Sequence, residues 1–123
     1  MTSAISNIFI VEDDALIAML LEDMLDELGY KVSSRAANLE DALVLATKDD
    51  FDAAILDVSL AGKSSLPVAR YLDEIGMPYL FATGYGTAPE GGRNDQPVLS
   101  KPYQLEQLGK ALTALAAAAS QRT

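Results

Sequence analysis

Short apolar runs alternate with longer segments of helical periodicity along the chain. The runs have the length and composition of buried strands, and they occupy residues 8–11, 30–34, 53–58, 78–82 and 97–100. Apolar residues recur at helical spacing in the segments between them, at Leu16, Met19, Leu20, Met24, Leu25 and Leu28, at Leu39, Ala42, Leu43 and Ala46, and over residues 67–75. Gly29 and Gly76 predict where two of these helices end. A loop containing Gly62 is expected before the third helix, and a last helix is expected from about Tyr103.

This alternation of strands and helices is typical of a parallel sheet with right-handed crossovers and helices on both faces. Five such units within residues 1–123 predict one α/β domain with the flavodoxin-like, doubly wound fold and the strand order 2-1-3-4-5. The segment "GYGTAPEGGRNDQ", residues 84–96, departs from the pattern because it contains four glycines and a proline. An interior glycine costs a helix roughly 1 kcal/mol and a proline about 3. We therefore expect the fourth helix to be short or missing.

Composition narrows the classes of function. Nine basic and 18 acidic side chains give a net charge of −9, which argues against binding to nucleic acid or to an anionic membrane surface. The chain has no cysteine and no histidine, so disulfides, histidine metal ligands and a catalytic histidine are excluded. It begins without the pattern of a signal peptide, and no apolar run approaches 18 residues. We expect a cytoplasmic protein.

Polar residues end the predicted strands, at the edge where doubly wound sheets bind ligands. They are Glu12, Asp13, Asp14, Asp57, Thr83 and Lys101. In the predicted order the first, third, fourth and fifth strands are neighbours, so these side chains should converge. Crowded carboxylates favour a cation, and all-oxygen ligands select a hard ion such as Mg²⁺. A lysine and a hydroxyl nearby suit phosphoryl oxygens, so the pattern indicates a carboxylate nucleophile, Mg²⁺ and a phosphate.

Each residue also has a structural interpretation. Carboxylates before a helix compensate its dipole, an aspartate after a strand is often a turn residue, and Lys-Pro often begins a helix. The conjunction of all of them at one edge of the sheet favours the functional interpretation.

The set "VEDD", "LDVS", "AT" and "SKP", in this order and spacing, resembles the receiver domain of two-component response regulators over essentially the whole chain. The resemblance implies that Asp57 is the phosphoacceptor. It further implies that Asp57 is also an Mg²⁺ ligand, that Asp13 is a direct ligand, that Glu12 binds the ion through water, and that the carbonyl of Ser59 is another ligand. Asp14, which follows the acidic pair, is expected to cap the first helix.

The stretch "PYLFATGYG" is similar to the signature of the single-domain receivers called FAT GUY, found in alphaproteobacteria, and "LDVSLAGKSSLPVA" resembles them too. The resemblance implies that the Thr83 hydroxyl moves towards the phosphoryl group and that Lys101 is the charge partner of that group. The usual aromatic switch residue is Val98 here, so Tyr85 is expected to replace it. A surface aromatic packed on its own loop is the alternative for Tyr85.

The resemblance implies transfer of a phosphoryl group from a sensor histidine kinase to Asp57, which then switches binding to a downstream phosphotransfer or effector protein. Such a domain catalyses only its own phosphorylation and dephosphorylation and is not otherwise an enzyme. A phosphate sink or shuttle without a dedicated effector is the main alternative. An aspartate-nucleophile phosphatase of the haloacid dehalogenase type is disfavoured, because Ser59 stands where its general acid would be. A flavodoxin-type electron carrier is disfavoured because "EDD" would repel the phosphate of FMN.

Overall fold

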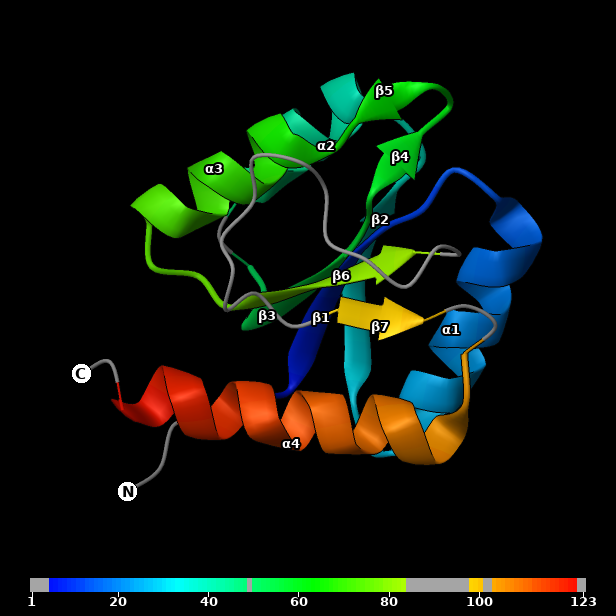
Figure 1. Ribbon diagram of the computed structural model, residues 1–123, viewed down its shortest axis with the longest axis vertical. Coiled ribbons are helices and arrows are strands. Elements are labelled where there is room, and N and C mark those ends of the chain that lie inside the picture. Colours follow the sequence, from blue (N-terminus) through cyan, green and yellow to red (C-terminus); the bar gives the residue numbers. More distant parts are fainter. Residues whose placement is uncertain (1–4, 49, 84–97, 101–102, 122–123) are drawn as a thin grey trace.

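The computed structural model describes residues 5–48, 50–83, 98–100 and 103–121. Five strands form one parallel sheet in the order β2-β1-β3-β6-β7 (Figure 1). The strands are β1 (Asn7–Val11), β2 (Lys31–Ala36), β3 (Ala53–Asp57), β6 (Tyr79–Thr83) and β7 (Val98–Ser100). Since β6 and β7 are the fourth and fifth strands of this sheet along the chain, the predicted doubly wound fold and its strand order are confirmed.

Helices cover both faces of the sheet. Those in the described part of the chain are α1 (Ala15–Glu27), α2 (Leu39–Ala46), α3 (Leu66–Glu74) and α4 (Leu105–Gln121). Figure 1 shows α2 and α3 on one face, with α1 and α4 on the other. The expectation of a short or missing fourth helix concerns residues that lie outside the described ranges, and the four described helices are consistent with it.

Alternate residues of each strand enter two separate cores. Ile8 and Ile10 belong to the core beneath α1 and α4, whereas Phe9 and Val11 belong to the core beneath α2 and α3. The helices complete the first core with Leu21, Leu25, Leu108, Leu112 and Leu115, and the second with Ala42, Ala46, Val68, Ala69 and Leu72. Because both faces of the sheet are buried at β1, β3 and β6, these strands have continuous apolar runs in the sequence, whereas the edge strand β2 is more polar and partly exposed.

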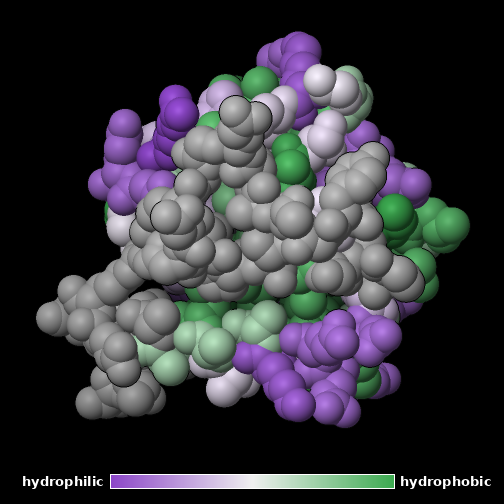
Figure 2. Space-filling model, viewed as in Figure 1, coloured by the Kyte–Doolittle hydropathy of each residue, from purple (hydrophilic) through white to green (hydrophobic). Residues whose placement is uncertain are grey.

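Helix α1 leaves part of its apolar surface exposed. Asp14 caps it as expected, since Oδ1 of Asp14 accepts hydrogen bonds from the amides of Leu16 and Ile17 at 2.9 and 3.2 Å. The helix packs on the sheet through Ala18, Leu21 and Leu25. Of these, only Leu25 belongs to the predicted apolar stripe, and three members of that stripe are exposed, namely Leu16 at 67%, Met19 at 56% and Leu20 at 51%. Hydrophobic side chains gather over α1 at the right edge of Figure 2.

The connection from β3 to α3 is a hairpin and not the plain loop that was expected. Strands β4 (Ser59–Leu60) and β5 (Lys63–Ser64) pair antiparallel. Directly after the hairpin, Ser65 is fully buried, and its amide and hydroxyl both donate to the carbonyl of Val58, at 3.0 and 3.2 Å. The hairpin is thereby closed immediately beyond Asp57.

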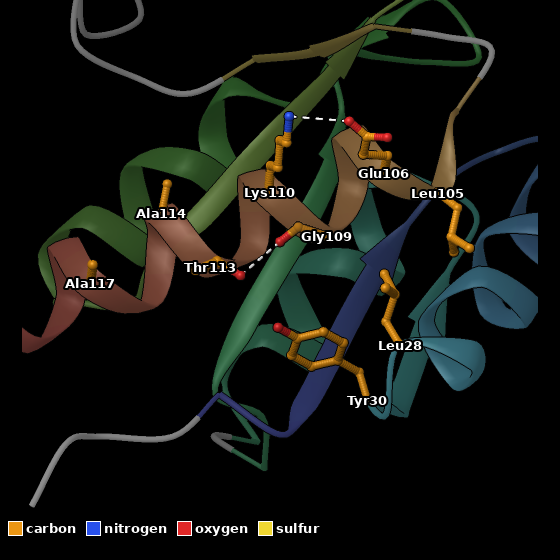
Figure 3. A pocket seen from close by; sticks show the side chains of 9 residues that line it. All are labelled: Leu28, Tyr30, Leu105, Glu106, Gly109, Lys110, Thr113, Ala114 and Ala117. Atoms are coloured by element: carbon orange, nitrogen blue, oxygen red, sulfur yellow. Dashed lines mark hydrogen bonds and ion pairs between the residues drawn. The ribbon is translucent and has the colours of Figure 1, made fainter.

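A groove of about 670 Å³ runs along α4, beside the segment that joins α1 to β2 (Figure 3). Apolar and small side chains line most of it, and the Glu106–Lys110 ion pair of 3.1 Å lies on its α4 side. Its wall is tight at Gly109, where an added Cβ would lie 3.3 Å from Cδ2 of Leu28. None of the strand-end carboxylates lines this groove, so it is separate from the predicted site.

Candidate functional site

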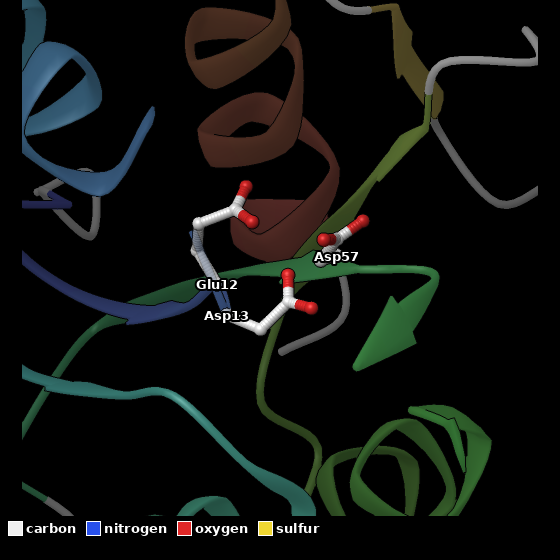
Figure 4. A group of neighbouring side chains, drawn as sticks. All are labelled: Glu12, Asp13 and Asp57. Atoms are coloured by element: carbon white, nitrogen blue, oxygen red, sulfur yellow. The ribbon is translucent and has the colours of Figure 1, made fainter. Parts of the chain in front are cut away.

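The carboxyl ends of β1 and β3 bring three carboxylates together. Glu12 and Asp13 directly follow β1, and Asp57 is the last residue of the neighbouring β3. The three side chains each offer an oxygen within 4.8 Å of the others, and Figure 4 shows them facing a common space. The chain passes from β1 through α1 to β2, which lies on one side of β1, whereas β3 lies on the other side of β1. This is the switch point of the strand order, where doubly wound sheets bind ligands. The convergence predicted from the strand ends is therefore observed for these residues.

Burial places the like charges of the cluster in a poorly solvated space. Glu12 is 4% exposed and Asp57 is 9% exposed, whereas Asp13 lies at the surface. Two unit charges separated by 4.8 Å repel by about 3.5 kcal/mol at an effective dielectric constant of about 20. The donor set consists of carboxylate oxygens, which are the ligands that Mg²⁺ prefers. The cluster thus fits a hard divalent cation.

Asp13 is held in its ionised form. Its partial burial raises the pKa, but hydrogen bonds outweigh this effect and keep the pKa below its ordinary value of 3.8. The first of these bonds comes from the amide of Ala61, which donates to Oδ2 of Asp13 at 2.9 Å. Asp13 therefore carries a negative charge at neutral pH.

Two further predicted residues lie next to this cluster in the fold. Thr83 ends β6 and is 3% exposed, and the residue before it, Ala82, pairs with Asp57. Ser59 begins β4, two residues after Asp57, and is exposed. The predictions for Lys101 and Tyr85 concern positions outside the described residues, so both stay predictions.

Two groups near the carboxylates were not predicted from the sequence. Tyr103 was expected only as the start of the last helix, yet burial, followed by the negative charges of Glu12 and Asp57, raises the pKa of its phenol. The position of this aromatic residue, directly after the Lys-Pro motif, could have indicated that it lies near the site. The second group, the Ala61 amide, has no signal of its own because every residue except proline carries such a donor.

The fold and the acidic edge define a class of protein: an α/β domain that presents a buried aspartate and two further carboxylates at its switch point. The chain belongs to the family described as the response regulator receiver domain, which matches residues 8–113. Domains of this family are phosphorylated on an aspartate in two-component signalling and bind Mg²⁺ at an acidic pocket. This confirms the receiver-domain prediction, while membership of the FAT GUY subgroup stays a prediction.

Individual relatives agree with this membership. The two-component response regulator PhoP from Pseudomonas aeruginosa is 33% identical in an alignment of 116 positions, which covers 88% of this chain and 50% of PhoP. The structure of SdrG from Sphingomonas melonis Fr1 is 42% identical, with a TM-score of 0.82 over 92% of this chain and 98% of SdrG. A BeF3-activated conformation of SdrG from Pseudomonas melonis Fr1 is 40% identical, with a TM-score of 0.76 over 93% and 98%.

The chain spans about half or less of the length of the curated relatives that it matches, PhoP among them. In the described part of the chain, no helix combines the length and the apolar character needed to cross a membrane.

Proposed function

We propose that this chain receives a phosphoryl group on Asp57 from a sensor histidine kinase, in the cytoplasm where such kinases use ATP. The observation that carries the proposal is the approach of Glu12, Asp13 and Asp57 to within 4.8 Å of one another at the switch point of the sheet. Glu12, Asp13 and the carbonyl of Ser59 would hold Mg²⁺ beside Asp57. When bound, the ion would neutralise the negative charge that gathers around the transferred phosphoryl group.

Asp57 suits the role of nucleophile because β3 fixes its position. It ends a strand whose five residues are all buried, so its carboxylate is approached from the edge of the sheet. A carboxylate oxygen attacks the phosphorus in line, the bond from phosphorus to the imidazole nitrogen of the donor breaks, and an aspartyl phosphate forms. The neutral imidazole leaves with the electron pair of that bond. Lys101 is proposed to pair with the phosphoryl oxygens.

The phosphorylated state adds a charge of about −1.5 to −2 next to existing carboxylates. We propose that the buried hydroxyl of Thr83 donates to the new oxygens and that Tyr85 reports the change to a downstream phosphotransfer or effector protein. The BeF3-activated conformation of the 40% identical SdrG supports a switch of this kind. A phosphate sink without an effector is the second candidate. Turnover of external phosphate esters is disfavoured, because Ser59 lacks the acidity of a general acid.

The exposed stripe on α1, formed by Leu16, Met19 and Leu20, supports a docking face for the donor. It occupies the first two turns of a helix that begins two residues after Asp13. A donor that reaches Asp57 must cover this edge of the domain, so it would bury the stripe. The same helix then presents the exposed Asp23, Asp26 and Glu27, which favours a donor surface with basic residues around an apolar centre.

The assignment of Asp57 is tested by labelling with acetyl phosphate, which needs no knowledge of the kinase. Mg²⁺-dependent labelling should be lost in Asp57→Asn and in excess EDTA. Asp26→Asn, an exposed carboxylate of α1, is the matched control and should be labelled like the wild type. Labelling that persists in Asp57→Asn would contradict the assignment.

A further inference from the structure

The turn of the β4–β5 hairpin has an unusual backbone. Ser59 pairs with Ser64 and Leu60 with Lys63, which leaves Ala61 and Gly62 as the two turn residues. Both have positive φ, at 51° and 88°, as a type I′ turn requires. Among the described residues Ala61 is the only non-glycine with positive φ, a conformation that residues with a side chain rarely adopt. The surrounding contacts must therefore hold this turn in place.

Three contacts hold the hairpin, and one of them comes from the turn itself. Leu60, 1% exposed, anchors β4 in the core beneath α2 and α3. Lys63 in β5 forms an ion pair of 2.8 Å with Glu40 of α2. At the tip, the amide of Ala61 donates to Oδ2 of Asp13 at 2.9 Å. The burial of Leu60 fixes β4, while the exposed Lys63–Glu40 pair adds little, and the amide at the tip lies within hydrogen-bond distance of that carboxylate.

This hydrogen bond determines how Asp13 presents its carboxylate. Asp13 lies at the surface just beyond β1, where no core packing restricts its side chain. A hydrogen bond to a charged acceptor is stronger than a neutral one, and a carboxylate offers about four acceptor positions. The Ala61 amide therefore occupies only one acceptor position of the Asp13 carboxylate. The other acceptor positions can bind a cation in the space shared with Glu12 and Asp57 (Figure 4).

We propose that the amide of Ala61 is a positioning group for Asp13, which orients the carboxylate for a divalent cation and so raises the cation affinity of the acidic cluster. The inference deepens the proposed function and rests on it, because it takes Asp13 to be a cation ligand. A ligand that is oriented before binding loses less conformational freedom when the ion arrives. The hairpin and the cluster are then coupled: loss of the amide hydrogen bond weakens cation binding, and the cation in turn stabilises the turn.

The first test is the amide resonance of Ala61 in the ¹⁵N-resolved NMR spectrum of the cation-free protein. Asp13→Ala should shift the Ala61 amide proton upfield and speed its exchange with solvent. Asp14→Ala, one residue further along the chain, should leave both unchanged. An Ala61 proton that does not respond to Asp13→Ala overturns the proposal.

The second test removes only the donor. Lactic acid in place of Ala61 replaces the amide N–H by an ester oxygen and keeps the methyl group. We expect Mg²⁺, titrated by calorimetry, to bind this protein about tenfold more weakly, as the loss of one hydrogen bond to a charged group predicts. Ala61→Gly keeps the N–H and tolerates the positive φ, so it should bind Mg²⁺ like the wild type. Equal Mg²⁺ affinity of the ester and the wild type overturns the proposal.

Separate measurements distinguish structural damage in the ester protein from failure of the proposed function. The amide resonances of Lys63, Ser64 and Ser65 should keep their wild-type positions in the ester, which shows that the hairpin is intact. The role of Asp57 is tested independently by labelling of Asp57→Asn, so either idea can fail without the other.

Discussion

Replacing Asp57 by asparagine should stabilise the cation-free protein. Glu12 and Asp57 are 4% and 9% exposed, and their carboxylate oxygens lie within 4.8 Å of each other. The repulsion of such a pair is about 3.5 kcal/mol at an effective dielectric constant of about 20. Asparagine keeps the shape and one acceptor oxygen but removes a charge. Since hydrogen bonds to the carboxylates offset part of the repulsion, we expect the free energy of unfolding to rise by about 2 kcal/mol.

The assay is urea unfolding in EDTA, followed by circular dichroism, for the wild type and Asp57→Asn. The midpoint should rise in the variant while the slope stays the same, because the surface exposed on unfolding does not change. Excess Mg²⁺ should stabilise the wild type more than the variant, since the cation relieves the same repulsion. The exposed Asp26→Asn control should stay within about 0.5 kcal/mol of the wild type. An Asp57→Asn protein that unfolds at the same or a lower urea concentration in EDTA would refute the repulsion argument.

Three other predictions concern single contacts. Asp14→Ala should lower the free energy of unfolding by about 1 kcal/mol through loss of the α1 cap, and unchanged urea stability would contradict this. Replacing both Leu16 and Met19 by serine should slow labelling by a phosphorylated histidine kinase but not by acetyl phosphate, with the exposed Val44→Ser as control; an equal loss with both donors would argue against docking. The pKa of Asp13 is lowered, so its stabilisation is present above about pH 4 and is lost as the pH falls through the folded pKa. In Asp13→Asn the free energy of unfolding should therefore fall less steeply as the pH is lowered below about 4. An unchanged pH dependence of the unfolding free energy would show that Asp13 does not contribute.

Much of the fold follows from local pattern. The apolar runs that became β1, β3 and β6 are buried on both faces, so their composition alone indicated strands. The strand ends predicted the carboxylate cluster because parallel strands align their carboxyl ends at one edge of a sheet. Glu12, Asp13 and Asp57 were thus predictable without contact information.

What could not be predicted depends on tertiary structure. The apolar stripe of α1 is wider than one packed face, and only the placement of the sheet determines that Leu21 is buried while Leu20 is exposed. The β4–β5 hairpin was missed because Ala61 at a positive φ contradicts local preference, and a contact with Asp13, 48 residues away, holds it there. The pKa of Tyr103 is raised first by burial and then by the charges of Glu12 and Asp57, and no local sequence window contains this environment.

The division of the interior into two cores has an evolutionary consequence. Leu80 and Ala82 enter one core and Phe81 the other. A substitution on one face of the sheet therefore changes the packing of one core only. The effects of changes that share no packing partner add independently. Helix α1 belongs to one layer only, so its exposed stripe, which we propose as the docking face for the kinase, can change in evolution without altering the packing of the α2–α3 layer.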